Sequence, residues 1–153
     1  MNLDDLPKLA LSIRQPWAHA IVQGWKPVEN RHWVTRLRGP ICIHASKHNK
    51  ASWADDVEGY TDLVESRGID HPLPALEDLA FGAIVGTADI VDCVDDYPSK
   101  WFCGPNGLVL ANARSLAKPI PIIGKLGFFE WRGREPKPAE PKTPELPAQG
   151  SLF

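Results

Sequence analysis

The sequence has few cysteines and no long hydrophobic run, and each absence excludes a class of protein. Cys42, Cys93 and Cys103 are odd in number and show no Cys-x-x-Cys or Cys/His spacing, so neither a disulfide framework nor a metal site is expected. No apolar stretch approaches the roughly 20 residues that a membrane helix needs. The first residues carry two acids and no cationic segment before an apolar one, which argues against a secretory signal. We therefore expect a cytoplasmic protein with free thiols, no membrane contact, no metal and no cofactor.

The charged residues are divided unevenly along the chain, although the net charge is only -2. Residues 1–50 hold eight Lys and Arg against three Asp and Glu, whereas residues 51–100 hold two against twelve. Such a division predicts one basic face and one acidic, solvated face. The basic face has the charge that is needed to meet phosphate groups.

Hydrophobic periodicity divides the first 131 residues into short strands and two main helices. Strands are expected at 9–13, 27–34, 40–46, 82–94, 107–112 and 127–131, and helices at 15–24 and 50–67. The β-branched segment 82–94 is expected to be the longest strand and to lie near the centre of the sheet. The two prolines of 118–124 argue against a central strand there. Helices inserted between the early strands indicate an α+β domain around a small mixed β-barrel.

The remaining residues, 132–153, have a different composition. They are rich in proline and show no core pattern, which is typical of an extended, disordered tether. The sequence therefore predicts one folded domain at 1–131 and a proline-rich tail at 132–153.

The segment 11–47 resembles the start of ASCH domains, which belong to the PUA-like superfamily. The family's G-x-K-x-x-E-x-R signature stands here as 24–31, GWKPVENR, between Gln15-Pro16-Trp17-Ala18 and Arg38-Gly39. Segments 82–93 and 118–131 are similar to the family's central strand and closing segment. These matches resemble most the branch found in a transcriptional cointegrator, and together they cover about residues 9–131.

The resemblance implies a PUA-like β-barrel with a cleft beside the helix that carries the signature. It also implies a partner: RNA, DNA or a modified nucleobase. Some minimal bacterial members of the family resemble amidohydrolases that act on N4-acetylcytidine, and a ribonuclease activity has been attached to others. Binding without chemistry is the first hypothesis, and these two hydrolytic reactions are the alternatives.

Lys26, Glu29 and Arg31 are the candidate site residues with the clearest physical role. Strand alternation places Glu29 and Arg31 on one face, and Lys26 is expected at the mouth of the cleft. The two cations suit phosphate or base-edge acceptors, and the carboxylate could accept from an exocyclic amine. The alternative is a structural ion pair that joins helix to strand, which in an exposed position contributes about 0–1 kcal/mol.

Aromatic and basic residues near the signature extend this candidate surface. Interleaved rings and cations suit base stacking, and Trp25, beside a helix-ending glycine, is expected to expose its ring, whereas Trp17 is expected in the core. The further candidate nucleic-acid contacts are Gln15, Arg36, Arg38 and Lys47. The three cations among them suit salt-sensitive contacts with a phosphate backbone.

An enzymatic function would assign catalysis to Lys26 and Glu29. The minimal amidohydrolases carry a threonine three positions after the lysine, and Glu29 stands in its place here. An amide hydrolase needs an activated nucleophile, so loss of this hydroxyl weakens transfer of that mechanism. A ribonuclease could use Glu29 as a base with Lys26 stabilising charge.

The last five residues, QGSLF, resemble the bacterial sliding-clamp-binding peptide. Gln149 would bond at the rim of the clamp's groove, and Leu152 and Phe153 would fill it. Gly150 departs from the usual leucine. This resemblance would make the chain a clamp-recruited adaptor in a bacterium or its phage, with the tail as its leash.

Overall fold

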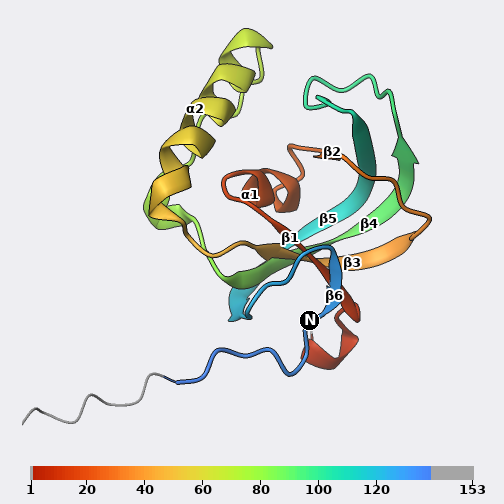
Figure 1. Ribbon diagram of the computed structural model, residues 1–153, viewed down its shortest axis with the longest axis vertical. Coiled ribbons are helices and arrows are strands. Elements are labelled where there is room, and N and C mark those ends of the chain that lie inside the picture. Colours follow the sequence, from red (N-terminus) through yellow and green to blue (C-terminus); the bar gives the residue numbers. More distant parts are fainter. Residues whose placement is uncertain (1, 139–153) are drawn as a thin grey trace, which may run out of the picture.

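The computed structural model describes residues 2–138, which form a curled six-stranded sheet around one short helix (Figure 1). The strands are β1 (Leu9–Ile13), β2 (Val28–Arg31), β3 (Gly39–Ala45), β4 (Ala83–Val94), β5 (Asn106–Pro121) and β6 (Phe128–Glu130). The helices are α1 (Trp17–Val22) and α2 (Lys50–Ser66), with 3-10 turns at Leu3–Asp5 and Leu76–Asp78. The strand order is β2-β5-β4-β3-β1-β6, and the β1–β3 pair is parallel whereas the other four pairs are antiparallel.

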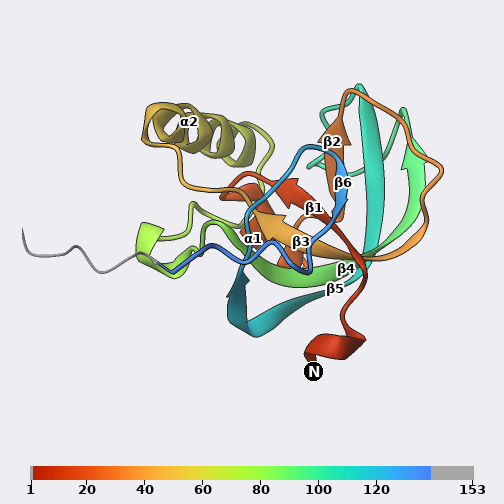
Figure 2. The same ribbon diagram turned by 60° about the horizontal axis from the view of Figure 1, so that its bottom comes forward.

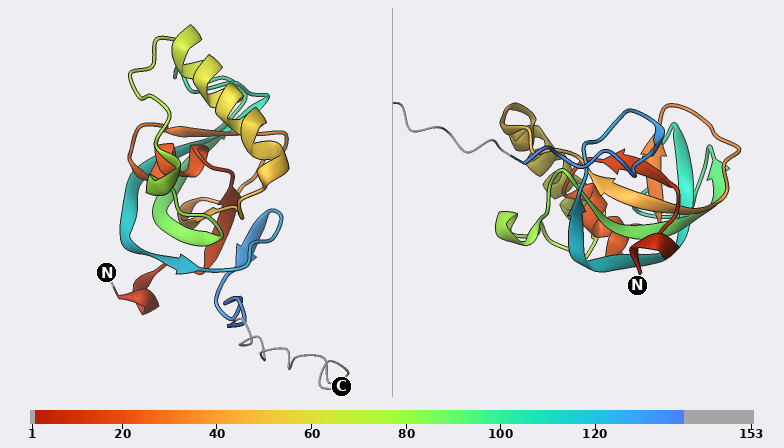
Figure 3. Two further views of the ribbon diagram at one scale, coloured as in Figure 1. Left: turned by 90° about the vertical axis from the view of Figure 1, so that its left-hand side faces the viewer. Right: turned by 90° about the horizontal axis from the view of Figure 1, so that it is seen from below.

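The sheet curls because its two longest strands are interrupted by bulges. The β4–β5 register shifts between Ile84 and Gly86, between Thr87 and Asp89, and again after Ile90. Each bulge bends its strand and increases the local twist. The paired strands therefore curve around α1, as the left view of Figure 3 shows. The expected α+β fold around a small mixed barrel is confirmed.

The alternation of β3 separates two layers of apolar side chains, as its sequence predicts. Ile41 and Ile43 join the cluster that packs against α1, whereas Cys42 joins a second cluster with Ile84 and Phe129. Close contact between α1 and the sheet depends on Gly86, because a Cβ atom there would lie 2.6 Å from Val22 Cγ1. The absence of a side chain at Gly86 therefore allows α1 to pack directly against β4 in the core.

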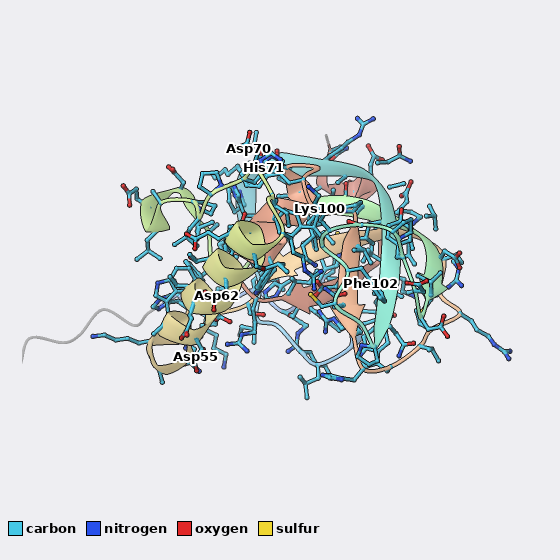
Figure 4. All side chains as sticks on the ribbon, turned by 90° about the horizontal axis from the view of Figure 1, so that it is seen from above. Asp55, Asp62, Asp70, His71, Lys100 and Phe102 are labelled. Carbon is cyan, nitrogen blue, oxygen red and sulfur yellow. The ribbon has the colours of Figure 1, made fainter. Side chains whose placement is uncertain are left out.

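The long helix α2 stands beside the sheet rather than inside its curl (Figure 2). Its buried residues Tyr60 and Val64 pack with Ala20, Val28 and Trp101. The side chain of Asn49 accepts a hydrogen bond from Ala51 N and so caps the helix start. Asp55 and Asp62 lie on α2 in Figure 4, and they contribute to the acidic, solvated face expected from the charge division.

Two expectations about the second half of the chain are wrong. The longest strand is β5, not β4, and it does not end at residue 112 but continues through Pro119 to Pro121. Strand β2 pairs with β5 only at 106–109, so the prolines lie where β5 has a single neighbour, β4. A residue without an N–H group is tolerated at such an edge. The central position expected for β4 is confirmed, since it is third in the order of six.

Residues just after the expected domain boundary are still bonded to the domain. Arg132 donates to the carbonyl oxygens of Leu3 and Leu6, and Arg134 donates to those of Ile123 and Gly124. The clamp-binding candidates Gln149, Leu152 and Phe153 lie outside the described residues, so that hypothesis stays a prediction. None of the helices in the part that the structure describes is long and apolar enough to cross a membrane.

Candidate nucleic-acid interface

Lys26, Glu29 and Arg31 meet in one ionic cluster, as their spacing predicts. A left-handed turn at Gly24 ends the α1 segment and leads into edge strand β2. Lys26 Nζ donates to Glu29 Oε1 at 2.7 Å and to the Val28 carbonyl at 2.6 Å. Arg31 Nη2 donates to Glu29 Oε2 at 3.0 Å. Both carboxylate oxygens are therefore occupied by cations of the same chain.

The ionic cluster is buried, which distinguishes it from the exposed ion pair considered from the sequence. The Lys26 side chain is 2% exposed and that of Glu29 10%. Lys26 thus lies at the base of the cleft, and its expected position at the mouth is wrong. Removing one partner of such a pair leaves a desolvated charge, at a cost of about 3–5 kcal/mol. The ionic cluster is consequently expected to contribute more to the free energy of unfolding than the exposed ion pair considered from the sequence.

Arg31 connects the edge strand β2 to the other side of the curl. Its Nη2 also donates to the Ser12 carbonyl at 2.9 Å, which joins β2 to β1 across the opening of the half-barrel. Its Nε is buried, and no group in residues 2–138 accepts a hydrogen bond from it. An unsatisfied buried donor costs about 1–3 kcal/mol. A ligand in a cleft would therefore meet the exposed part of the Arg31 side chain, which is 21% exposed, and not Nε.

An open cleft of about 640 Å³ surrounds this guanidinium; we call it the Arg31 cleft. One side is formed by β2 and the residues next to it (Lys26, Glu29, Arg31 and Trp33). The other side is formed by the end of β1 and by residues 125–127 before β6. The cleft therefore fills the gap between the two edge strands. Its four Lys and Arg side chains (Arg14, Lys26, Arg31, Lys125) face one carboxylate, that of Glu29. The excess of positive charge favours an anionic ligand.

Two tryptophan rings contribute to the walls of the cleft. Trp17 is half-buried and packs against the core as expected, yet it also lines the cleft, with Lys26 Nζ 5.9 Å from its ring centroid. Trp33 lies 5.7 Å from the Arg31 guanidinium and packs edge-to-face on Phe128. Ring and guanidinium together form a surface of the kind on which bases stack.

Trp25 does not reach the Arg31 cleft. Its ring is half-buried and stacks on His71 with a centroid separation of 4.4 Å and an interplanar angle of 5°. His71 lies in the loop after α2, where Figure 4 labels it. The expected exposed ring at the site is therefore wrong, because the α2 connection covers Trp25. This residue contributes to the packing of α2.

Gln15 and the outer cations also lie outside the Arg31 cleft. Gln15 is buried, its amide donates to the Ala80 carbonyl, and its oxygen accepts from His19 N, so both ends have partners within the chain. Arg38 bonds the carbonyls of residues 35 and 37 and lies 3.6 Å from Asp92. Arg36 and Lys47 are exposed, and Lys47 lines a second hollow beside the cleft.

Arg14, Asn30 and Lys125 line the cleft, and sequence reasoning did not identify them as candidate contacts. Arg14 directly follows the buried strand β1, and a cation at the end of a strand was an available signal. Lys125 is almost one hundred residues distant from the signature, and only the pairing of β6 with β1 brings its loop to the site.

A hydroxyl–imidazole pair lies beside the cleft. Ser12 Oγ is 2.7 Å from His44 Nδ1, and His44 Nε2 is 2.7 Å from the Ile122 carbonyl. Burial lowers the pKa of His44, so the neutral ring that donates from Nε2 is favoured. The Gly124 backbone packs so closely that an added Cβ would lie 2.7 Å from both Ser12 Oγ and the imidazole. The pair is therefore a satisfied structural contact.

No group of three or more His, Cys, Asp or Glu side chains within residues 2–138 is arranged to hold a metal ion. The three cysteines are free thiols, and burial raises the pKa of Cys42 to about 12. With no metal-binding group among the described residues, a ligand in the Arg31 cleft would meet mainly cationic side chains.

Comparisons with known proteins agree with the motif. A model of the ASCH domain matches residues 11–120. The human protein Activating signal cointegrator 1 is 32% identical over 123 residues, which cover 74% of this chain and 20% of that protein. The mouse protein of the same name is 32% identical over 85 residues, which cover 55% of this chain and 14% of that one.

The chain thus spans about a fifth of the length of the human relative. A crystal structure of ASCH from Zymomonas mobilis aligns with a TM-score of 0.44 and 17% identity over 73% of this chain and 71% of that one. The domain match covers well over half of the sequence and includes the signature at 24–31. This chain belongs to the ASCH domain family.

Proposed function

We propose that this ASCH domain binds RNA or DNA by holding one unpaired nucleotide in the Arg31 cleft. The observation that carries the proposal is the guanidinium of Arg31, whose side chain is 21% exposed and lies in a cleft where four Lys and Arg side chains face one carboxylate. Phosphate oxygens or the acceptor edge of a base suit these cations.

The walls of the cleft favour a nucleotide over a simple anion. Trp17 and Trp33 supply aromatic surface, and stacking contributes about 1–3 kcal/mol per base. Arg14 and Lys125 are exposed at the two sides and suit phosphate contacts. Because base faces are accessible only outside a duplex, this arrangement favours single strands or extruded bases. A free modified nucleobase would use the same walls with fewer phosphate contacts.

Hydrolysis ranks below binding in this proposal. The ammonium of Lys26 already donates to Glu29 and to the Val28 carbonyl, so neither Lys26 nor Glu29 is poised as a free acid or base. The hydroxyl–imidazole pair of Ser12 and His44 lies against the Gly124 backbone, which leaves little room for an attacked carbonyl. An enzyme of either kind would need this cluster to rearrange.

The test is fluorescence anisotropy with labelled single-stranded RNA, single-stranded DNA and duplex over a series of salt concentrations. The variant Lys125→Glu changes an exposed residue of the cleft, and Lys118→Glu changes an exposed lysine of β5 outside it. We expect binding that weakens with salt, with a slope of about −0.7 per phosphate contact on a single strand. Lys125→Glu should lower both the affinity and the slope, and Lys118→Glu should change neither.

Two outcomes would contradict the proposal. One is a folded protein that binds none of the strands, and the other is an equal loss of affinity in both lysine variants. Gel analysis of the same samples separates binding from cleavage, and shortened strands would revive the ribonuclease alternative. Binding of a free acetylated cytidine in place of strands would favour the modified-nucleobase alternative.

A further inference from the structure

A second hollow adjoins the Arg31 cleft, and its function is not assigned by the signature. It has a volume of about 340 Å³ and lies between the end of β3 and the first turns of α2; we call it the Trp53 hollow. Its lining includes Ser46, Lys47, Ser52, Trp53 and Phe81. Arg14 and Ser46 line both the hollow and the cleft, so the two spaces are neighbours that meet at these residues.

The Trp53 hollow repeats the chemistry of the Arg31 cleft. Trp53 packs edge-to-face on Phe81 at 5.7 Å and 80°, and His48 packs edge-on against Phe81 at 4.8 Å. Trp53 and Phe81 therefore form an aromatic wall of the hollow, with His48 packed against both rings and Trp53 half-buried. Lys47 is exposed beside it and supplies a cation. An aromatic surface with a neighbouring cation is the unit from which single-strand binding sites are built.

Arg14 stands between the two spaces in a fixed orientation. Its Nη2 lies 2.7 Å from Asp56 Oδ1 of α2, and the Arg14 side chain is 55% exposed whereas that of Asp56 is 13% exposed. The carboxylate thus holds the guanidinium from the side of α2 and leaves its other N–H groups available to a ligand. Arginine presents several donors in a planar fork, so one edge can bond a carboxylate while another bonds a phosphate.

We propose that the two spaces are consecutive nucleotide subsites and that the ligand is a single strand of at least two nucleotides. The strand crosses at Arg14 and Ser46, where the connecting phosphate meets the guanidinium, and one base lies in each aromatic site. This inference rests on the proposed function of the Arg31 cleft. It specifies the ligand as a strand, because a free nucleoside or mononucleotide would leave the Trp53 hollow empty.

The test compares the affinities of strands of one, two, four and eight nucleotides, as RNA and as DNA, by competition against a labelled octamer. Wild-type protein is measured beside Trp53→Leu, which removes the ring of the hollow and leaves the cleft intact. We expect the affinity to rise by about fivefold or more from one nucleotide to two, and Trp53→Leu to abolish this step while leaving mononucleotide affinity unchanged. Circular dichroism and thermal melting check that α2 is still folded.

A second variant keeps the test decisive if Trp53→Leu perturbs α2. Lys47→Gln changes an exposed side chain, and we expect it to weaken the dinucleotide and longer strands and to reduce their salt dependence. Equal affinity for one and two nucleotides in wild type, with binding still sensitive to Lys125→Glu, would overturn the two-subsite inference alone. If wild type binds no strand of any length, the proposed function fails and the inference fails with it.

Discussion

The variant Glu29→Gln tests whether the ionic cluster is a buried structural element. It removes the negative charge that Lys26 and Arg31 share and leaves the ammonium of Lys26, on a side chain 2% exposed, with only neutral acceptors: the Val28 carbonyl and the new amide oxygen. Loss of one partner in a buried pair costs about 3–5 kcal/mol, against about 0–1 kcal/mol for exposed pairs. Because Glu29 and Arg31 keep 10% and 21% exposure, we expect the lower end, about 3 kcal/mol.

The assay is urea unfolding at neutral pH, followed by tryptophan fluorescence and circular dichroism. A loss of about 3 kcal/mol corresponds to a fall in Tm of roughly 10 °C for a domain of this size. Glu130→Gln is the matched control, because Glu130 pairs with Lys8 at 3.0 Å on the surface, with both side chains more than half exposed. That variant should lose less than about 1 kcal/mol.

A double-mutant cycle with Lys26→Met separates the ion pair from other effects of the substitution. Removing both charges avoids the uncompensated ammonium, so the double variant should be more stable than Glu29→Gln alone. If Glu29→Gln costs no more than Glu130→Gln, or the cycle gives no coupling, water solvates these charges and the reasoning from burial is refuted. The stabilising role assigned to the cluster would then also be refuted.

Three further predictions concern stability and thiol reactivity rather than ligand binding. The lowered pKa of His44 means that the unfolded chain binds a proton more readily than the folded one, so the free energy of unfolding should fall as pH drops below about 6.5. In urea titrations His44→Gln should flatten this dependence on pH, and an unchanged dependence would contradict the prediction. Cys42 is fully buried and its pKa is raised to about 12, so it should resist a thiol reagent until the protein unfolds, whereas the exposed Cys103 should react in the native state. Mass spectrometry of the labelled peptides shows which of the two thiols has reacted. Gly86→Ala should lower stability by about 1–3 kcal/mol in the same urea assay, because the added methyl meets Val22 and the backbone of Arg114, and a neutral effect would show that α1 can shift away from the sheet.

The sequence predicted the elements whose residues alternate or recur at helical spacing. β1 was predicted at its observed bounds, 9–13, and α2 was predicted within one residue at each end. One exception is β5 beyond residue 112, where the two prolines concealed a strand, and another is the strand expected at 27–34, which is observed only at 28–31. Proline excludes a segment from the centre of a sheet but not from its edge, and which segment lies at an edge depends on pairing with strands elsewhere in the chain.

For the candidate site, the sequence predicted the cluster and missed most of the walls. Glu29 and Arg31 are two residues apart on one strand, so local geometry was enough to place them together. Trp25 was wrongly chosen over Trp33, because exposure depends on the loop that carries His71 over its ring. Lys125 could not be assigned, since its position follows from the pairing of the last strand with the first.

That pairing also determines when the domain can be completed during synthesis. β1 is the first strand made, and its partner β6 leaves the ribosome almost 120 residues later. At about 5–20 residues per second, β1 waits roughly 6 to 24 seconds with one edge unpaired. Residues 125–127, which close the Arg31 cleft, emerge just before β6. Under the proposed function, a nascent chain therefore has no finished site with which to capture the RNA around it until β6 has emerged and paired with β1.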